Sequence, residues 1–155
     1  MGISIEEIGD RIEIRRLVDE YAIGVDTRDA ERFAALFAAD ATLSVVEPGE
    51  EEPSLVYTGH AELRTVIELV AAFSVTYHVM TNHVVDIDGD TATASTYGLT
   101  HHLSESDERG LFDTLMLLRY DDELVRVDGS WVFKARRIVR QWTDYCEAEK
   151  ARLAG

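Results

Sequence analysis

The chain is poor in cysteine and in basic residues, and both shortages narrow what the protein can be. Its 155 residues include a single cysteine, Cys146, so no disulfide can form within the chain, which fits a reducing compartment. Only 15 Lys and Arg residues stand against 30 Asp and Glu residues, for a formal net charge of -15. Nucleic acids and anionic membrane surfaces bind clustered Lys and Arg, so neither is an expected partner. A small neutral or weakly acidic organic molecule, or a protein, fits better.

The sequence also lacks a long apolar run. No stretch approaches the ~20 residues that a membrane-spanning helix needs, and the nearest, residues 66–73, is interrupted by Glu68. The first residues carry acids where a secretory signal would carry its cationic segment and apolar core, so we expect a cytoplasmic protein. Length and a hydrophobic content of 46% predict one domain over residues 1–155.

Helical periodicity dominates the first part of the chain. Ser4 and Glu7 have capping-box spacing, and apolar residues at helical spacing then predict a long helix that reaches Val25. A short second helix is predicted over residues 31–37, ended by Asp40. The elements expected next are a strand over 41–46, a solvated loop or mobile flap over 47–54, which holds both prolines and four glutamates, and a helix that begins at Gly59–His60.

Beyond Ser74 the apolar pattern alternates, as in strands. Strands are predicted over 76–87, 91–103, 111–127 and 130–142, and a terminal helix over 144–153. The sequences Asp88-Gly89-Asp90 and Asp128-Gly129 predict hairpin turns, because glycine tolerates the positive φ of tight turns. Helices followed by antiparallel strands form an α+β pattern, in which a curved antiparallel sheet wraps around the N-terminal helices and encloses a pocket.

Asp26 is the first candidate for chemistry. It follows Val25 at the edge of the apolar stripe of the first helix, where a carboxylate is unusual. The alternative is that Asp26 or Asp29 only caps the second helix. The histidines on the predicted strands are His78, His83, His101 and His102. Because side chains alternate along a strand, at most one of His78 and His83, and one of the two adjacent histidines, is expected to face the interior.

An Asp–His pair across the pocket would act as a general base with its orienting group, because a carboxylate fixes one imidazole orientation and stabilises the imidazolium. No histidine spacing typical of a zinc site, glycine-rich phosphate loop or nucleophile elbow is present, so no metal or cofactor is expected. Five further side chains have open alternatives. Tyr21 is a cavity donor or a core aromatic, and Asn82 holds a turn or contacts ligand. Arg136, Arg137 and Arg140 are a solvated, charge-balancing set, or one of them faces the pocket and binds a carboxylate.

Two segments resemble a known family, the nuclear transport factor 2-like superfamily, in its SnoaL-like branch. Residues 23–28 (Ile-Gly-Val-Asp-Thr-Arg) and 77–82 (Tyr-His-Val-Met-Thr-Asn) resemble the catalytic Asp and His segments of gamma-hexachlorocyclohexane dehydrochlorinase. The resemblance implies a cone-shaped α+β fold and a catalytic role for Asp26 and His78. By spacing from the Asp-Gly-Asp turn, the second cavity histidine of scytalone dehydratase corresponds to His102, or in the next register to His101.

The resemblance also has departures. The Ser and Asn with which scytalone dehydratase binds substrate correspond here to Thr114 and Met116, so that polar set is not kept, but the correspondence implies that both residues contact substrate. The family implies a cofactor-independent lyase, foremost a dehydratase, or a related isomerase or cyclase, acting on a small, largely apolar molecule. The alternative is a non-catalytic ligand-binding or assembly subunit, similar to the beta subunits of ring-hydroxylating dioxygenases. Family members form homodimers or homotrimers through the outer sheet face, where Leu99, Leu115 and Leu117 are expected.

Overall fold

Three helices precede or interrupt the strands in the computed structural model, which describes residues 2–106, 108 and 110–149. They are α1 (Ile5–Asp26), α2 (Ala30–Ala35) and α3 (Gly59–Val70). The hydroxyl of Ser4 caps α1 by accepting from the backbone N–H of Glu7 at 3.1 Å. The long first helix is therefore confirmed. None of the helices in the described ranges combines the length and the apolar character that crossing a membrane requires.

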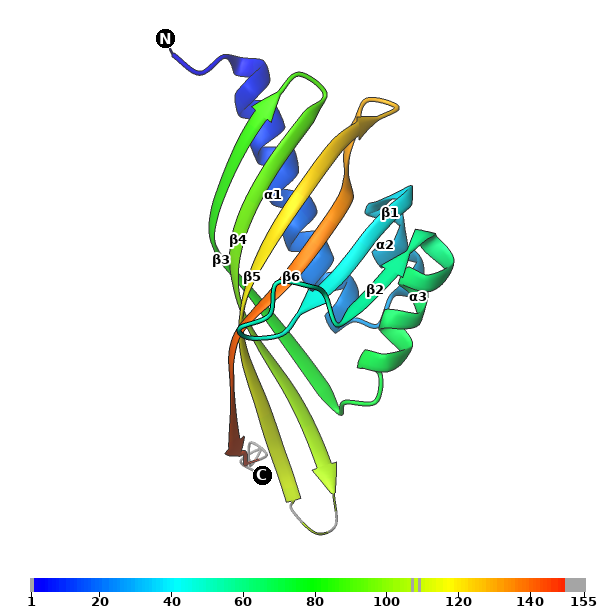
Figure 1. Ribbon diagram of the computed structural model, residues 1–155, viewed down its shortest axis with the longest axis vertical. Helices are drawn as coiled ribbons and strands as arrows, with labels where there is room; N and C mark the ends of the chain where they lie inside the picture. Colours follow the sequence, from blue (N-terminus) through cyan, green and yellow to red (C-terminus); the bar gives the residue numbers. More distant parts are fainter. Residues whose placement is uncertain (1, 107, 109, 150–155) are drawn as a thin grey trace, which may run out of the picture.

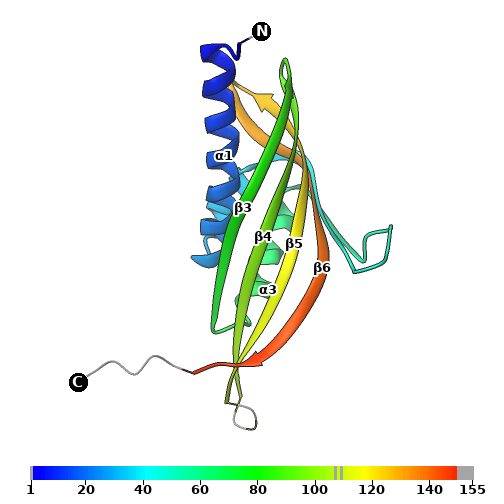
Figure 2. The same cartoon turned by 90° about the vertical axis from the view of Figure 1, so that its left-hand side faces the viewer.

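One mixed, unclosed sheet makes up the rest of the fold (Figure 1). Its strands are β1 (Phe37–Val46), β2 (Leu55–Thr58), β3 (Val75–Asp88), β4 (Thr91–Ser106), β5 (Gly110–Val127) and β6 (Ser130–Glu147), in the spatial order β2-β1-β6-β5-β4-β3. The β1–β6 pair is parallel and the other pairs are antiparallel, which corrects the expectation of an antiparallel sheet. The α+β class with a curved sheet around the helices is confirmed. Figure 2 shows α1 standing along the concave side of the curved strands.

The core fills the space between the helices and the concave sheet face. Tyr21 of α1 packs with its ring centroid 5.3 Å from that of Phe33 and 5.8 Å from that of Tyr120. Phe37 and Phe133 join this aromatic cluster, with centroids 5.1 Å apart. Large aromatic side chains bury much apolar area each, so this cluster fixes the end of α1 against the sheet.

Two predicted boundaries are wrong because strand pairing overrides local pattern. Phe37 does not end the second helix: it begins β1 and pairs with Phe133, so Asp40 lies within a strand. The predicted terminal helix over 144–153 is instead strand as far as Glu147, because Glu147 pairs with Phe112 on β5. Its residues 150–153 lie outside the described residues. The short strand β2 was not predicted.

A β-bulge in β3 overturns the expected alternation of His78 and His83. The register with β4 shifts between Met80 and His83 because β3 has one extra residue there. The side chains after the bulge therefore point to the sheet face opposite to the one that regular alternation predicts. Arg15 of α1 covers the bulge by donating to the carbonyl of Met80 at 3.0 Å and to the next carbonyl at 2.9 Å. As a result His83 Nδ1 lies 2.9 Å from the hydroxyl of the buried Thr96, and both histidines face the helices.

Candidate active site

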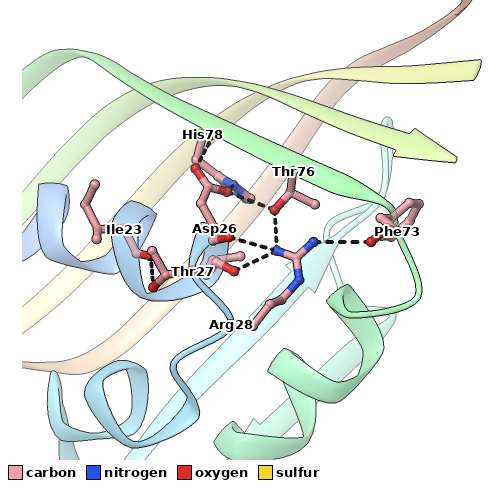
Figure 3. Close-up of polar contacts among 8 residues, drawn as sticks. Ile23, Asp26, Thr27, Arg28, Phe73, Thr76 and His78 are labelled. Atoms are coloured by element: carbon pink, nitrogen blue, oxygen red, sulfur yellow. Dashed lines mark hydrogen bonds and ion pairs between the residues drawn. The ribbon is translucent and has the colours of Figure 1, made fainter. Parts of the chain in front are cut away.

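The end of α1 is tied to the start of β3 by one arginine (Figure 3). Arg28 has a φ of 60°, in the left-handed region, which turns its side chain back over the helix end. Its Nη1 donates to the Val25 carbonyl at 2.8 Å and to the Thr76 hydroxyl at 2.5 Å. Its Nη2 donates to the Phe73 carbonyl at 3.4 Å. These contacts hold Asp26, the last residue of α1, against β3.

Asp26 contacts β3 through both carboxylate oxygens. Its Oδ1 accepts from the Thr76 hydroxyl at 2.9 Å and lies 2.6 Å from His78 Nδ1, while Oδ2 accepts from the His78 backbone N–H at 2.8 Å. The capping role falls to another residue: Asp29 accepts from the Arg32 N–H at 3.0 Å at the start of α2. The structure thus places Asp26 and His78 in direct contact, as expected.

These contacts set the protonation of the pair. Burial raises the pKa of Asp26, but hydrogen bonds from the His78 side chain and backbone and from Thr76 outweigh it, so this pKa is lowered overall. An ionised carboxylate can only accept, so the proton between the two side chains resides on His78 Nδ1. When the ring is neutral, its lone pair is therefore on Nε2, which has no hydrogen-bond partner among the residues that the structure describes.

A cavity of about 160 Å³ lies beside the His78 ring. Most of its wall is aliphatic or aromatic, and its polar lining residues are Tyr21, Tyr57, His78, His102, Tyr120 and Arg140. A larger hollow of about 660 Å³ is lined near the hairpin ends of the strands by residues such as Ile87 and Lys134, but it contains no histidine. The small cavity is the candidate active site because it alone of the two is lined by the histidine of the Asp–His pair, His78.

His102 faces the same cavity. Its ring centroid lies 5.4 Å from that of His78 and 4.8 Å from that of Phe73. Burial lowers the pKa of His102 to about 4, helped by the charges of His78, Arg28 and Arg140, so the ring is neutral at pH 7. Its Nδ1 is buried without a hydrogen-bond partner in the described part of the chain. The adjacent His101 points to the opposite sheet face.

Among the expected ligand contacts, Tyr21 and Met116 line the cavity, whereas Thr114 and Asn82 do not. Tyr21 is also 3% exposed in the aromatic core, which confirms the core alternative, while its role as a donor to ligand stays a prediction. Thr114 lies beside His102 in the β4–β5 register but outside the cavity lining, and Asn82 is exposed next to the bulge. The substrate-contact prediction is therefore not met for these two residues.

The three arginines of β6 do not form the solvated set that was expected. Arg136 is 1% exposed, donates to both Asp122 oxygens at 2.9 and 3.1 Å, and lies over the Tyr21 ring at 4.0 Å. Arg140 lines the cavity. Arg137 points away from it and donates to the carbonyl of Glu51 in the loop 47–54.

Sequence reasoning missed two residues of the site, Thr76 and Arg28. Thr76 stands two positions before His78 and therefore on the same strand face, a signal that could have identified it. Nothing in the local pattern marked Arg28, whose partners come from distant positions. Within residues 2–106, 108 and 110–149 no group of three or more His, Cys, Asp or Glu side chains is arranged to hold a metal ion.

Comparison with known proteins adds a family and several relatives. Residues 6–137 match the family model described as the SnoaL-like domain. An uncharacterized protein of Mycobacterium tuberculosis is 26% identical over 145 residues, covering 93% of this chain and 90% of that protein. A structure from Novosphingobium aromaticivorans named as a candidate scytalone dehydratase is 26% identical with a TM-score of 0.77, covering 96% of this chain and 95% of the other. A hexachlorocyclohexane dehydrochlorinase from Novosphingobium barchaimii, 20% identical with a TM-score of 0.78 over 97% and 99% of the two chains, shares the fold.

Proposed function

Because the chain belongs to the SnoaL-like family, we propose that it is a cofactor-independent lyase, foremost a dehydratase, that acts on a small and largely apolar organic molecule. The observation that carries the proposal is the 2.6 Å contact between Asp26 and His78 at the wall of a cavity. The relatives named as a dehydratase and a dehydrochlorinase support the same reaction class, elimination of a small group after loss of a proton.

In the proposed reaction, Nε2 of His78 removes a proton from a carbon next to an electron-withdrawing group. The electron pair of that C–H bond becomes the new carbon–carbon double bond as hydroxide leaves the adjacent carbon. Asp26 stabilises the imidazolium that forms, and the proton on His78 then joins the hydroxide, so the overall products are the alkene and water. Neutral His102 contributes a hydrogen bond to the departing oxygen. Return of the proton to another carbon would make the same site an isomerase.

A non-catalytic assembly subunit is the second candidate, favoured by the outer sheet face. Aromatic residues stand exposed there, among them Tyr77, Tyr97 and Trp142. Contiguous exposed apolar surface is typical of interaction sites, and a homodimer or homotrimer through this face is part of our proposal. A subunit without activity would not need an ionised carboxylate paired with a histidine at its interior, since desolvating a charge is costly. The lyase proposal accounts for that pair and is preferred.

The test uses a panel of small β-hydroxy carbonyl compounds incubated in deuterated water. Mass spectrometry detects deuterium at the acidified carbon and loss of water. The wild-type protein should convert at least one compound, and His78→Gln should lower its rate by about 10²- to 10⁴-fold, the usual contribution of a general base. His83→Gln is the matched control, since His83 lies on the same strand and face but outside the cavity. Unchanged turnover by His78→Gln would remove His78 as the base.

A further inference from the structure

Arg140 is the one side chain lining the cavity, within the part of the chain that the structure describes, that carries a full charge at neutral pH. It stands on β6, while His78 stands on β3, and the strands β5 and β4 separate them in the sheet. Arg140 and His78 therefore line the cavity from strands that are not neighbours. The neighbours of Arg140 in the lining, Leu118 and Ile138, are aliphatic and offer its guanidinium no counter-charge.

Glu47 is the partner of this arginine. Nη1 of Arg140 donates to both carboxylate oxygens of Glu47, at 3.0 and 3.1 Å, from the start of the acidic loop 47–54. The two side chains are 33% and 37% exposed, so their ion pair is partly solvated and readily exchanged. Nε and Nη2 of Arg140 have no partner within the described ranges. This free edge of the guanidinium has the geometry that a carboxylate binds in bidentate fashion.

A second, independent feature of the cavity points to a ligand. Nδ1 of His102 is buried and lacks a hydrogen-bond partner in the described residues, although His102 is only 6% exposed. Buried polar atoms are nearly always hydrogen-bonded, so an orphaned one in a cavity wall marks where a polar group of a ligand fits. A ligand that filled the cavity would meet Arg140 of β6, His102 of β4 and His78 of β3.

We infer that the substrate is a small organic acid whose carboxylate binds the Nε/Nη2 edge of Arg140 while the C–H bond to be broken faces His78. The inference rests on the proposed function and names its substrate class. Glu47 is the resident counter-ion of Arg140 and competes with the substrate carboxylate. In a chain with net charge -15, an anionic substrate needs such a dedicated cation to enter an otherwise uncharged cavity.

The test compares benzoate with its neutral isostere benzamide, using titration calorimetry and the imidazole NMR signals of His102. Wild-type protein should bind benzoate with shifts of the His102 signals. Arg140→Gln should weaken benzoate binding by about 10- to 100-fold, the value of hydrogen bonds to a charged group, and leave benzamide binding unchanged. Glu47→Gln should tighten benzoate binding, because it removes the competing carboxylate. Misfolding would weaken benzoate binding in both variants, so it could not explain weaker binding by Arg140→Gln together with tighter binding by Glu47→Gln.

Arg137→Gln is the matched control, because it removes the same charge from the same strand and also contacts the loop, yet lies outside the cavity. Its benzoate affinity should equal that of the wild type. Equal losses in Arg137→Gln and Arg140→Gln, benzoate binding that Arg140→Gln does not change, or no benzoate binding at millimolar concentration would each overturn the inference. His78→Gln should still bind benzoate, so failure of the proton-transfer proposal is distinguishable from failure of the carboxylate site.

Discussion

Replacing His102 with glutamine should remove part of the acid sensitivity of the fold. The pKa of His102 is lowered from 6.5 to about 4, so the folded protein holds this ring neutral while the unfolded chain binds a proton below pH 6.5. Protonation of the unfolded chain favours unfolding, and stability is therefore lost as pH falls from 6.5 to 4 and not further below. A shift of this size corresponds to about 3 kcal/mol, at 1.36 kcal/mol per pKa unit.

The assay is urea unfolding of the wild-type protein and His102→Gln, followed by circular dichroism at several pH values from 7 to 4. The carboxylates are the same in both proteins and contribute equally to the pH dependence of their stability. The difference between the two unfolding free energies at each pH therefore reports the contribution of His102. Relative to the variant, the wild type should lose up to about 3 kcal/mol over this interval. A difference that stays constant with pH would refute the conclusion that His102 is held neutral by burial in the cavity wall.

Two further predictions concern residues that position the site or support it. Thr76→Val removes a hydrogen bond that lowers the pKa of Asp26, so ¹³C NMR of the Asp26 carboxyl group should show titration at a higher pH than in the wild type; an unmoved titration would contradict a positioning role for Thr76. Asp122→Ala leaves the charge of Arg136 buried and unpaired, and urea unfolding should show a loss of about 3–5 kcal/mol. Asp121→Ala, which breaks a partly exposed pair on the neighbouring position, should cost less than about 1 kcal/mol, and equal losses would contradict the argument.

The contact between Asp26 and His78 could be predicted because each of the two residues lies in a recognisable local sequence pattern. A carboxylate at the edge of a helical stripe must approach whatever the helix covers, and an alternating strand with a histidine supplies its partner. The family resemblance pointed to the same two residues. The identity of the second cavity histidine followed only from the register that places His102, and not His101, on the helix-facing side of the sheet.

The remaining features depend on contacts between distant positions, which local patterns do not report. The bulge before His83 is stabilised by Arg15 from another element, and regular alternation therefore assigned the wrong face. Residues 144–147 continue β6 because β5 offers them a pairing partner. Arg136 is buried because Asp122 and a cluster of aromatic rings surround it, whereas its strand pattern alone favoured a solvated charge.

The central claim is that Asp26 holds His78 with a proton on Nδ1 and a lone pair on Nε2 facing the cavity. The most direct test is ¹⁵N NMR of the His78 imidazole near neutral pH, in the wild type and in Asp26→Asn. In the wild-type protein the deprotonated nitrogen signal should belong to Nε2, and the Asp26→Asn variant should lose this strict preference. A neutral His78 ring protonated on Nε2 in the wild type would contradict the account, because no base would then face the substrate.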